Sequence, residues 1–94
     1  MAVVKYFDWD KKKNQKLKLE RGIGFEDIIV AIDEDRLLVT LKHHKRSNQK
    51  IYVVNVGEYA YMIPFVEDDE KKFLKTIYPS RKMTKKYLIE RRKK

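Results

Sequence analysis

The chain has 94 residues, and its 23 lysines and arginines outnumber its 14 acidic residues, for a formal net charge of +9. This length suits one modest hydrophobic core, so residues 1–94 are expected to form a single domain. No apolar run approaches the roughly 20 residues of a membrane span, and the N-terminus lacks the apolar region of a signal peptide. Cysteine is absent, which excludes disulfides and thiolate metal sites. The sequence therefore predicts a soluble, cytoplasmic protein with no membrane partner.

The first third of the chain predicts one strand followed by two helices. Residues 3–7 are β-branched and aromatic, which favours a strand. Asp8 or Asp10 can cap a helix over residues 11–21, and Gly22 can end it. A second helix is indicated by apolar residues at helical spacing, namely Phe25, Ile28, Ile29 and Ile32. Trp9 lies where the first strand meets the first helix and is interpreted as a core residue.

The rest of the chain predicts an antiparallel meander. Gly57-Glu58 is a plausible two-residue turn, and the acidic run at residues 67–70 makes the next turn. Pro64 has no N–H to donate, so its strand is expected to have an edge or a bulge there. The expected strands are residues 36–42, 50–56, 59–66 and 72–78.

A last helix is expected to begin near Thr84, a good N-cap, and to carry Tyr87, Leu88 and Arg91 on one face. The predicted fold class is therefore α+β, with helices packed on one face of a curved antiparallel sheet. Two of those helices precede the meander and one follows it.

Positive charge is concentrated at the C-terminus. Residues 81–94 hold eight cationic side chains and one acid, a local net charge of +7. Such a cluster predicts an anionic partner, and the guanidinium of Arg81 is suited to a phosphate because its planar fork donates two hydrogen bonds. Tyr87 could donate a proton, stack on a base, or serve only as a core anchor beside Leu88.

The hairpin at residues 42–50 is also basic and contains His43-His44. A histidine can act as an acid or base in RNA cleavage, and adjacent strand residues face opposite ways, so a single site would use one of the two. The alternative is a solvated loop that contacts phosphate without chemistry. The carboxylates lie in predicted turns or first helical turns, and their spacing matches no zinc or magnesium site, so no metal and no cofactor is expected.

Three stretches together resemble the BrnT toxins of type II toxin–antitoxin modules. Phe7-Asp8-Trp9-Asp10 with Lys13-Asn14 is similar to their opening motif, and residues 22–27 are similar to their G-[IV]-x-F-E segment. Residues 77–87 resemble their closing motif, in which Arg81 matches the arginine, while Lys86 stands in place of a glutamate. The resemblance implies a RelE-like fold and a metal-independent endoribonuclease that inhibits translation. It also implies a cognate antitoxin, and binding to operator DNA only through the toxin–antitoxin complex.

The sequence thus predicts a toxin ribonuclease that cleaves RNA by internal attack of the 2′-hydroxyl. Arg81 would neutralise the phosphate, and removing such a stabiliser costs on the order of 10²–10³ in rate. His44 or Tyr87 would handle protons, with Lys50 and Lys85 assisting. The alternative is a non-catalytic basic module that binds nucleic acid or an antitoxin. The residues expected to contact RNA are Lys42, Lys45, Arg46, Lys50, Lys82 and Lys86.

Overall fold

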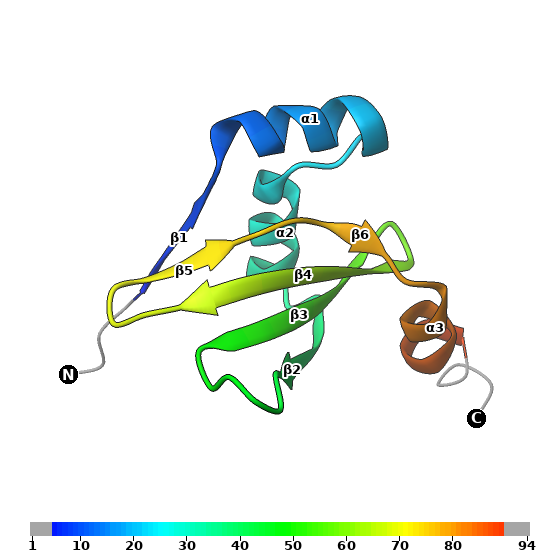
Figure 1. The fold of residues 1–94 in the computed structure, drawn as a ribbon. Helices are drawn as coiled ribbons and strands as arrows, with labels where there is room; N and C mark the ends of the chain where they lie inside the picture. The colour runs from blue at the N-terminus through cyan, green and yellow to red at the C-terminus, as the bar shows by residue number, and fades with distance from the viewer. Residues whose placement is uncertain (1–4, 90–94) are drawn as a thin grey trace.

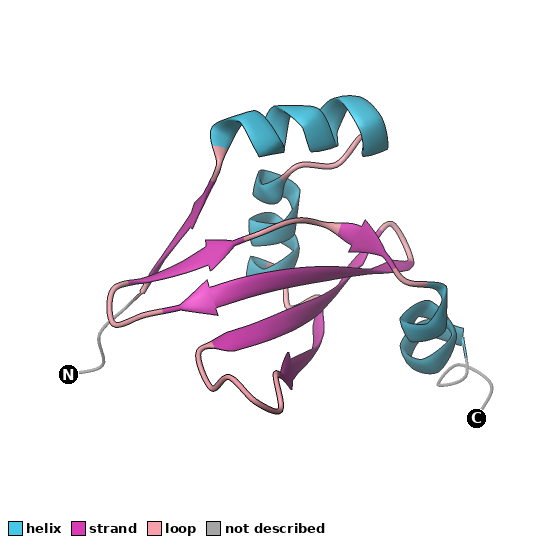
Figure 2. Ribbon diagram, viewed as in Figure 1, coloured by secondary structure: helices cyan, strands magenta, loops and turns pink. Residues whose placement is uncertain are grey.

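The computed structural model describes residues 5–89 and has the α+β architecture expected from the sequence (Figures 1 and 2). A short strand and two helices precede the meander, and a short helix follows it. The elements are β1 (Tyr6–Trp9), α1 (Lys11–Arg21), α2 (Phe25–Asp33), β2 (Leu37–Lys42), β3 (Gln49–Val56), β4 (Tyr59–Glu67), β5 (Lys71–Leu74), β6 (Tyr78–Pro79), α3 (Arg81–Thr84) and the π-helical turn η1 (Lys85–Ile89). None of the helices within residues 5–89 is long and apolar enough to cross a membrane.

The sheet is mixed, with strand order β1-β5-β4-β3-β2 and with β6 paired to β4. The meander from β2 to β5 is antiparallel, as predicted, but β1 runs parallel to β5, with Tyr6 opposite Lys71. A parallel pair needs a crossover connection, and the segment between β1 and the meander holds both α1 and α2. The expectation of an entirely antiparallel sheet was therefore wrong at this edge. Within the described residues the first strand is Tyr6–Trp9, and residues 3–4 of the predicted strand lie outside them.

Local signals placed both N-terminal helices correctly. The Asp10 carboxylate accepts hydrogen bonds from the backbone N–H groups of Lys12 and Lys13, so Asp10 is the N-cap of α1. Gly22 ends α1 with a φ of 70°, the left-handed conformation in which glycine has no steric penalty. In α2 the predicted stripe faces the core, where Phe25 and Ile28 are fully buried.

The two faces of the sheet are covered by different helices. The larger core packs α1 and α2 against side chains such as Tyr52, Val54 and Phe65. Leu88 of η1 instead packs against Val53 and Ala60, whose side chains project from the opposite face. The prediction that all helices cover one face was therefore wrong for the last helix (Figure 1).

Hydrogen bonds to Ala60, at the start of β4, place the last helix. Its N-cap is Ser80, whose hydroxyl accepts from the Met83 N–H at 3.1 Å, so the predicted start near Thr84 was wrong. Thr84 is buried one turn later, where its hydroxyl accepts from the Ala60 N–H at 2.8 Å and donates to the Ser80 carbonyl at 2.7 Å. Ser80 and Thr84 are both residue types that commonly cap helices, and Ser80 is the cap here because the Thr84 hydroxyl is bonded to Ala60 of β4. Arg91, predicted on this helix, lies outside the described residues.

The expected strand at residues 72–78 is interrupted beside Pro64. β5 pairs with β4 up to Phe65, β6 pairs with it from Met62, and the Lys75 N–H donates to the Pro64 carbonyl at 2.8 Å in the gap. Pro64 itself is in register with Ile51 of β3. The proline therefore lies where one neighbouring ladder is broken, as its missing N–H predicts.

A polar cluster joins α1 to α2. Asn14 is buried, and its side-chain oxygen accepts from the Phe25 N–H at 2.7 Å while its amide donates to Glu26 at 2.8 Å. Lys18 completes the cluster with a 2.9 Å ion pair to Glu26. The hydrogen bond from Asn14, then that from Lys18, lowers the pKa of Glu26 from 4.5 to about 2.

We expect the Glu26 cluster to make stability depend on pH in acid. A carboxyl whose pKa is depressed by folding stabilises the protein above its unfolded pKa, and this stabilisation is lost as the pH falls from 4.5 towards 2. Urea unfolding at a series of pH values should therefore show a smaller acid-dependent loss in Glu26→Gln than in the wild type. Glu20→Gln, which removes an exposed carboxylate from the same region, is the control. An unchanged acid dependence in Glu26→Gln would contradict the assignment.

Candidate nucleic-acid interface

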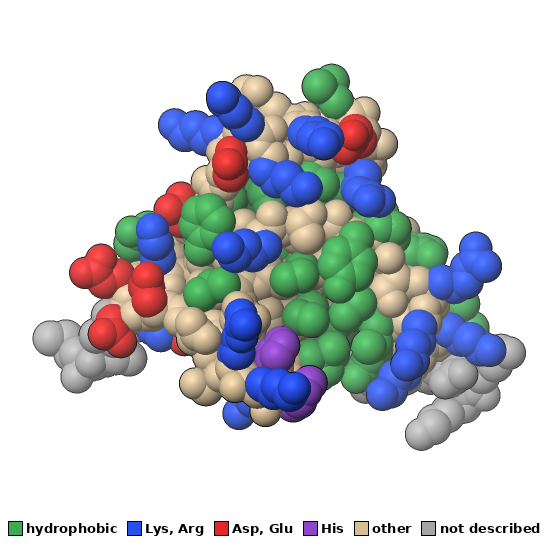
Figure 3. Space-filling view, in the orientation of Figure 1, with side chains coloured by type: hydrophobic (Ala, Val, Ile, Leu, Met, Phe, Trp, Pro, Cys, Tyr) green, Lys and Arg blue, Asp and Glu red, His purple; other side chains and the backbone are tan. Residues whose placement is uncertain are grey.

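One face of the sheet is left largely open by the helices, and it carries polar groups among apolar ones. The registers place Asp8, Phe73, Val66, Gln49 and His43 in one row across the strands on this face, since paired residues share a side. Figure 3 shows apolar side chains gathered in the middle of this view, with histidine and cationic side chains around them.

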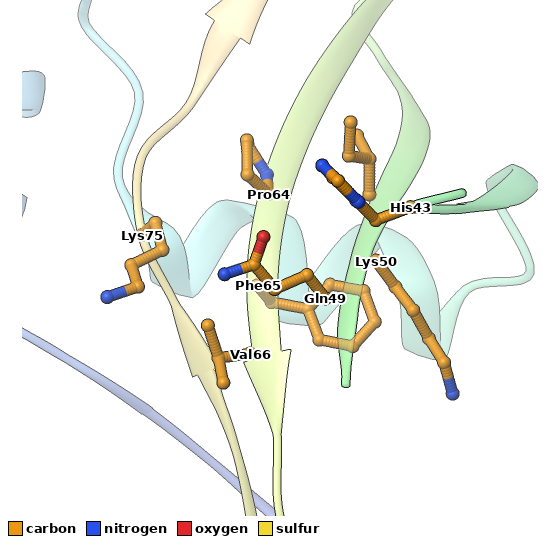
Figure 4. Close-up of a pocket in the computed structure, with 8 residues that line it drawn as sticks. His43, Gln49, Lys50, Pro64, Phe65, Val66 and Lys75 are labelled. Carbon is orange, nitrogen blue, oxygen red and sulfur yellow. The ribbon is translucent and has the colours of Figure 1, made fainter. Parts of the chain in front are cut away.

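A pocket of about 170 Å³ lies at the β2 to β5 part of this face. Besides Lys50, three polar residues line it: His43, Gln49 and Lys75. Figure 4 shows His43 and Lys75 on opposite sides, with the amide of Gln49 between them. The remaining lining residues are Lys50, Ile51, Pro64, Phe65 and Val66. The pocket thus offers an imidazole, an amide and an ammonium group above an apolar floor.

The two histidines of the hairpin have different environments. His43 lines the pocket, and its Nδ1 accepts from the backbone N–H groups of Lys45 at 3.1 Å and Arg46 at 3.2 Å. In the neutral ring the proton is therefore on Nε2, which makes that nitrogen a hydrogen-bond donor. Both histidines are exposed, and His44 stacks on His43 with ring centroids 5.1 Å apart, but His44 does not line the pocket. The histidine selected from the sequence, His44, is thus the one farther from this site.

The cations of the last helix form a second positive region. Arg81 is the first residue of α3, and its exposed guanidinium makes no ion pair with the rest of residues 5–89. Lys82, Lys85 and Lys86 are likewise exposed. The ammonium group of Lys86 lies 5.4 Å from the centroid of the half-buried Tyr87 ring. This region can attract phosphate, but no acid or base is held beside Arg81 by a hydrogen bond within the described part of the chain.

The two positive regions lie at opposite ends of β4. The residue preceding Arg81, Ser80, bonds to the Ala60 carbonyl, whereas the His43 row crosses β4 at Val66. Six residues of an extended strand span about 20 Å. The predicted catalytic residues Arg81 and His44 therefore do not converge on one reacting group, and Lys85 and Tyr87 lie with Arg81.

The other predicted RNA contacts divide between two settings. Lys42, Lys45 and Arg46 are exposed at the β2–β3 hairpin, close in sequence to the pocket. Lys50 lines the pocket, but its ammonium group pairs with Glu67 at 3.1 Å and is half-buried. Hydrogen bonds from Lys5 and then Lys50 lower the pKa of Glu67. Glu67 shares its charge between Lys5 and Lys50, and the ion pair holds the Lys50 ammonium group at this carboxylate, which weakens its predicted role against phosphate.

Gln49, Lys75 and Phe73 are residues of this face that the sequence analysis did not select. Alternation along β3 and β5 places them on one face, but only the strand order shows that Gln49 and Lys75 meet across β4. A further cationic surface was also overlooked: α1 holds six cationic residues and one acidic residue. Within residues 5–89, no group of three or more histidine or acidic side chains is placed to hold a metal ion.

Comparison of the chain with protein-family models, with characterised proteins and with solved structures finds no match.

Proposed function

We propose that this protein is the toxin of a type II toxin–antitoxin module, a metal-independent endoribonuclease that inhibits translation by cutting RNA. The observation that carries the proposal is the pocket in which His43, Gln49 and Lys75 converge on the open face of a basic domain. The order of elements and the resemblance to BrnT toxins support the same reading, with a RelE-like fold.

The pocket has the groups that cleavage of an RNA phosphodiester requires. Attack by the 2′-oxygen forms a new O–P bond, breaks the bond to the 5′-oxygen, and places extra negative charge on the non-bridging oxygens. Lys75 would neutralise that charge, while Nε2–H of His43 and the amide of Gln49 would donate hydrogen bonds to it. The 2′-hydroxyl would release its proton to water, and the departing 5′-oxygen would take one from water. This chemistry leaves a 2′,3′-cyclic phosphate and a 5′-hydroxyl.

The cations of α3 and η1 would bind RNA phosphates on one side of the phosphodiester that is cleaved. A single strand lying along β4 would extend from the His43 pocket to Arg81, a path of about 20 Å. Arg81, Lys82 and Lys86 would then contribute mainly affinity, which falls as the salt concentration rises. This assigns Arg81 a binding role in place of the catalytic role predicted from the sequence.

A cognate antitoxin would silence the toxin by covering the same face. The apolar side chains in the middle of Figure 3 and the cations around them would accept an amphipathic, acidic segment of the antitoxin. The toxin–antitoxin complex, and not the toxin alone, would bind operator DNA.

A second candidate function is non-catalytic binding of nucleic acid. It is favoured by the separation between Arg81 and the histidines, which leaves the strongest phosphate ligand away from any acid or base. It predicts affinity for RNA without chain cleavage.

The test is incubation of the purified chain with end-labelled single-stranded RNA in excess EDTA. The proposal expects cleavage with 2′,3′-cyclic phosphate ends. Binding without cleavage, on naked RNA and on translating ribosomes alike, would replace the nuclease with the binding module.

A further inference from the structure

Phe73 is an aromatic residue on the open face that neither hydrophobic core uses. Its neighbour Leu74 is 1% exposed and belongs to the core under α1 and α2, so alternation places Phe73 on the opposite side of β5. It is in register with Val66, which lines the His43 pocket. Phe73 therefore lies directly beside that pocket, on the open face.

Two lysines flank the ring, Lys71 at the start of β5 and Lys75 directly after its last residue. The ammonium group of Lys71 lies 5.8 Å from the Phe73 centroid, and that of Lys75 lies 5.4 Å from it. Positions 71, 73 and 75 alternate along the chain, so a single face presents a cation, a ring and a second cation. Lys75 also lines the pocket, which makes the arrangement continuous with the proposed reaction site.

The edge of the sheet extends this surface. Tyr6 of β1 is in register with Lys71 and is 55% exposed. Asp8 pairs with Lys71 at 3.4 Å and raises the pKa of that lysine. The Phe73 ring is half-buried, and cation–ring contacts at such a site stabilise a protein by only about 0.5–1 kcal/mol, which is a weak structural reason for placing an aromatic ring between two lysines.

We propose that Phe73 is a platform on which one unpaired RNA base stacks, next to the phosphate that is cut. Lys75 holds the phosphate next to that nucleotide, whereas Lys71, on the other side of the ring, is paired with Asp8. Stacking on an aromatic ring accepts any base, whereas the ring cannot reach a base that is paired in a duplex. The inference rests on the proposed function and adds its substrate class: single-stranded RNA, with a base subsite beside the pocket.

The test compares Phe73→Leu and Phe73→Trp with the wild type, using a single-stranded RNA oligonucleotide and the matching RNA duplex. Loss of a stacked base costs about 1–3 kcal/mol, so Phe73→Leu should bind the single strand about 5- to 150-fold more weakly. Phe73→Trp should bind it at least as tightly as the wild type. Affinity for the duplex should be the same in all three proteins, because the lysines are intact.

Tyr59→Leu is the matched control, since it removes a ring of the same sheet on the face that carries the α1–α2 core, and it should leave both affinities unchanged. Equal single-strand affinity in Phe73→Leu and wild type would overturn the platform while leaving the nuclease in place. Equal losses on single strand and duplex would overturn it as well, since they would indicate a general change in the face. A wild-type protein that binds no RNA would remove the proposed function and the platform together.

Discussion

Replacing His43 with alanine is expected to lower the rate of RNA cleavage by about 10²–10³-fold, the usual cost of removing one donor that stabilises a transition state. The affinity for uncut RNA should change little, because the lost hydrogen bond forms mainly to charge that develops during the reaction. Single-turnover cleavage and equilibrium binding of a 2′-deoxy analogue measure the two quantities separately.

His44→Ala is the matched control for this experiment. It removes the neighbouring imidazole, which stacks on His43 but lies outside the pocket, and it should retain nearly the full rate. Arg81→Ala should weaken RNA binding and reduce its salt dependence while the rate at saturating RNA is kept. The opposite pattern, in which Arg81→Ala abolishes cleavage and His43→Ala does not, would move the reaction centre to α3.

Replacing Asn14 with alanine is expected to destabilise the domain by about 1–3 kcal/mol. Asn14 accepts the buried N–H of Phe25, and without that acceptor the first turn of α2 has an unsatisfied donor inside the protein. The midpoint of urea unfolding measures the change. Gln15→Ala is the control, because Gln15 is an exposed amide on the same helix and should alter stability by less than about 0.5 kcal/mol.

A substitution at Gly24 tests the packing of the cluster formed by Asn14, Lys18 and Glu26. A Cβ atom at this position would lie 2.5 Å from the Lys18 side chain and 2.8 Å from the side-chain oxygens of Asn14 and Glu26. Gly24→Ala should therefore also lower stability, and combining it with Asn14→Ala should cost less than the sum of the two. Strict additivity would show that the cluster does not act as a unit.

Local chemistry explains why much of the fold was predictable. The limits of α1 follow from Asp10 and Gly22, and the stripe of α2 follows from helical periodicity. The turn at Gly57-Glu58 has φ angles of 60° and 66°, which is the hairpin geometry that these residues indicated. Each of these features depends on a few consecutive residues, so no distant contact was needed to decide it.

The wrong predictions concern features that are set by contacts between residues far apart in the sequence. Ser80 and Thr84 are both capping residues, and bonding to Ala60 selects the first of them as the cap. Tyr78 could continue the preceding strand by its own propensity, but the break beside Pro64 makes it part of a separate strand, β6. No local pattern reports that β1 lies parallel to β5, because these strands are far apart in the chain.

The amino-acid sequence by itself determined the α+β class, the helices of the first third, the meander and the excess positive charge, since each follows from composition or short-range pattern. Only the tertiary structure decided which side chains share a face and an end of the sheet. The strand order brought His43, Gln49 and Lys75 to one pocket, paired Lys50 with Glu67, and placed Arg81 at the other end of β4. The physical reason is that strand pairing and helix placement are set by which apolar surfaces can be buried together, and that depends on the whole chain.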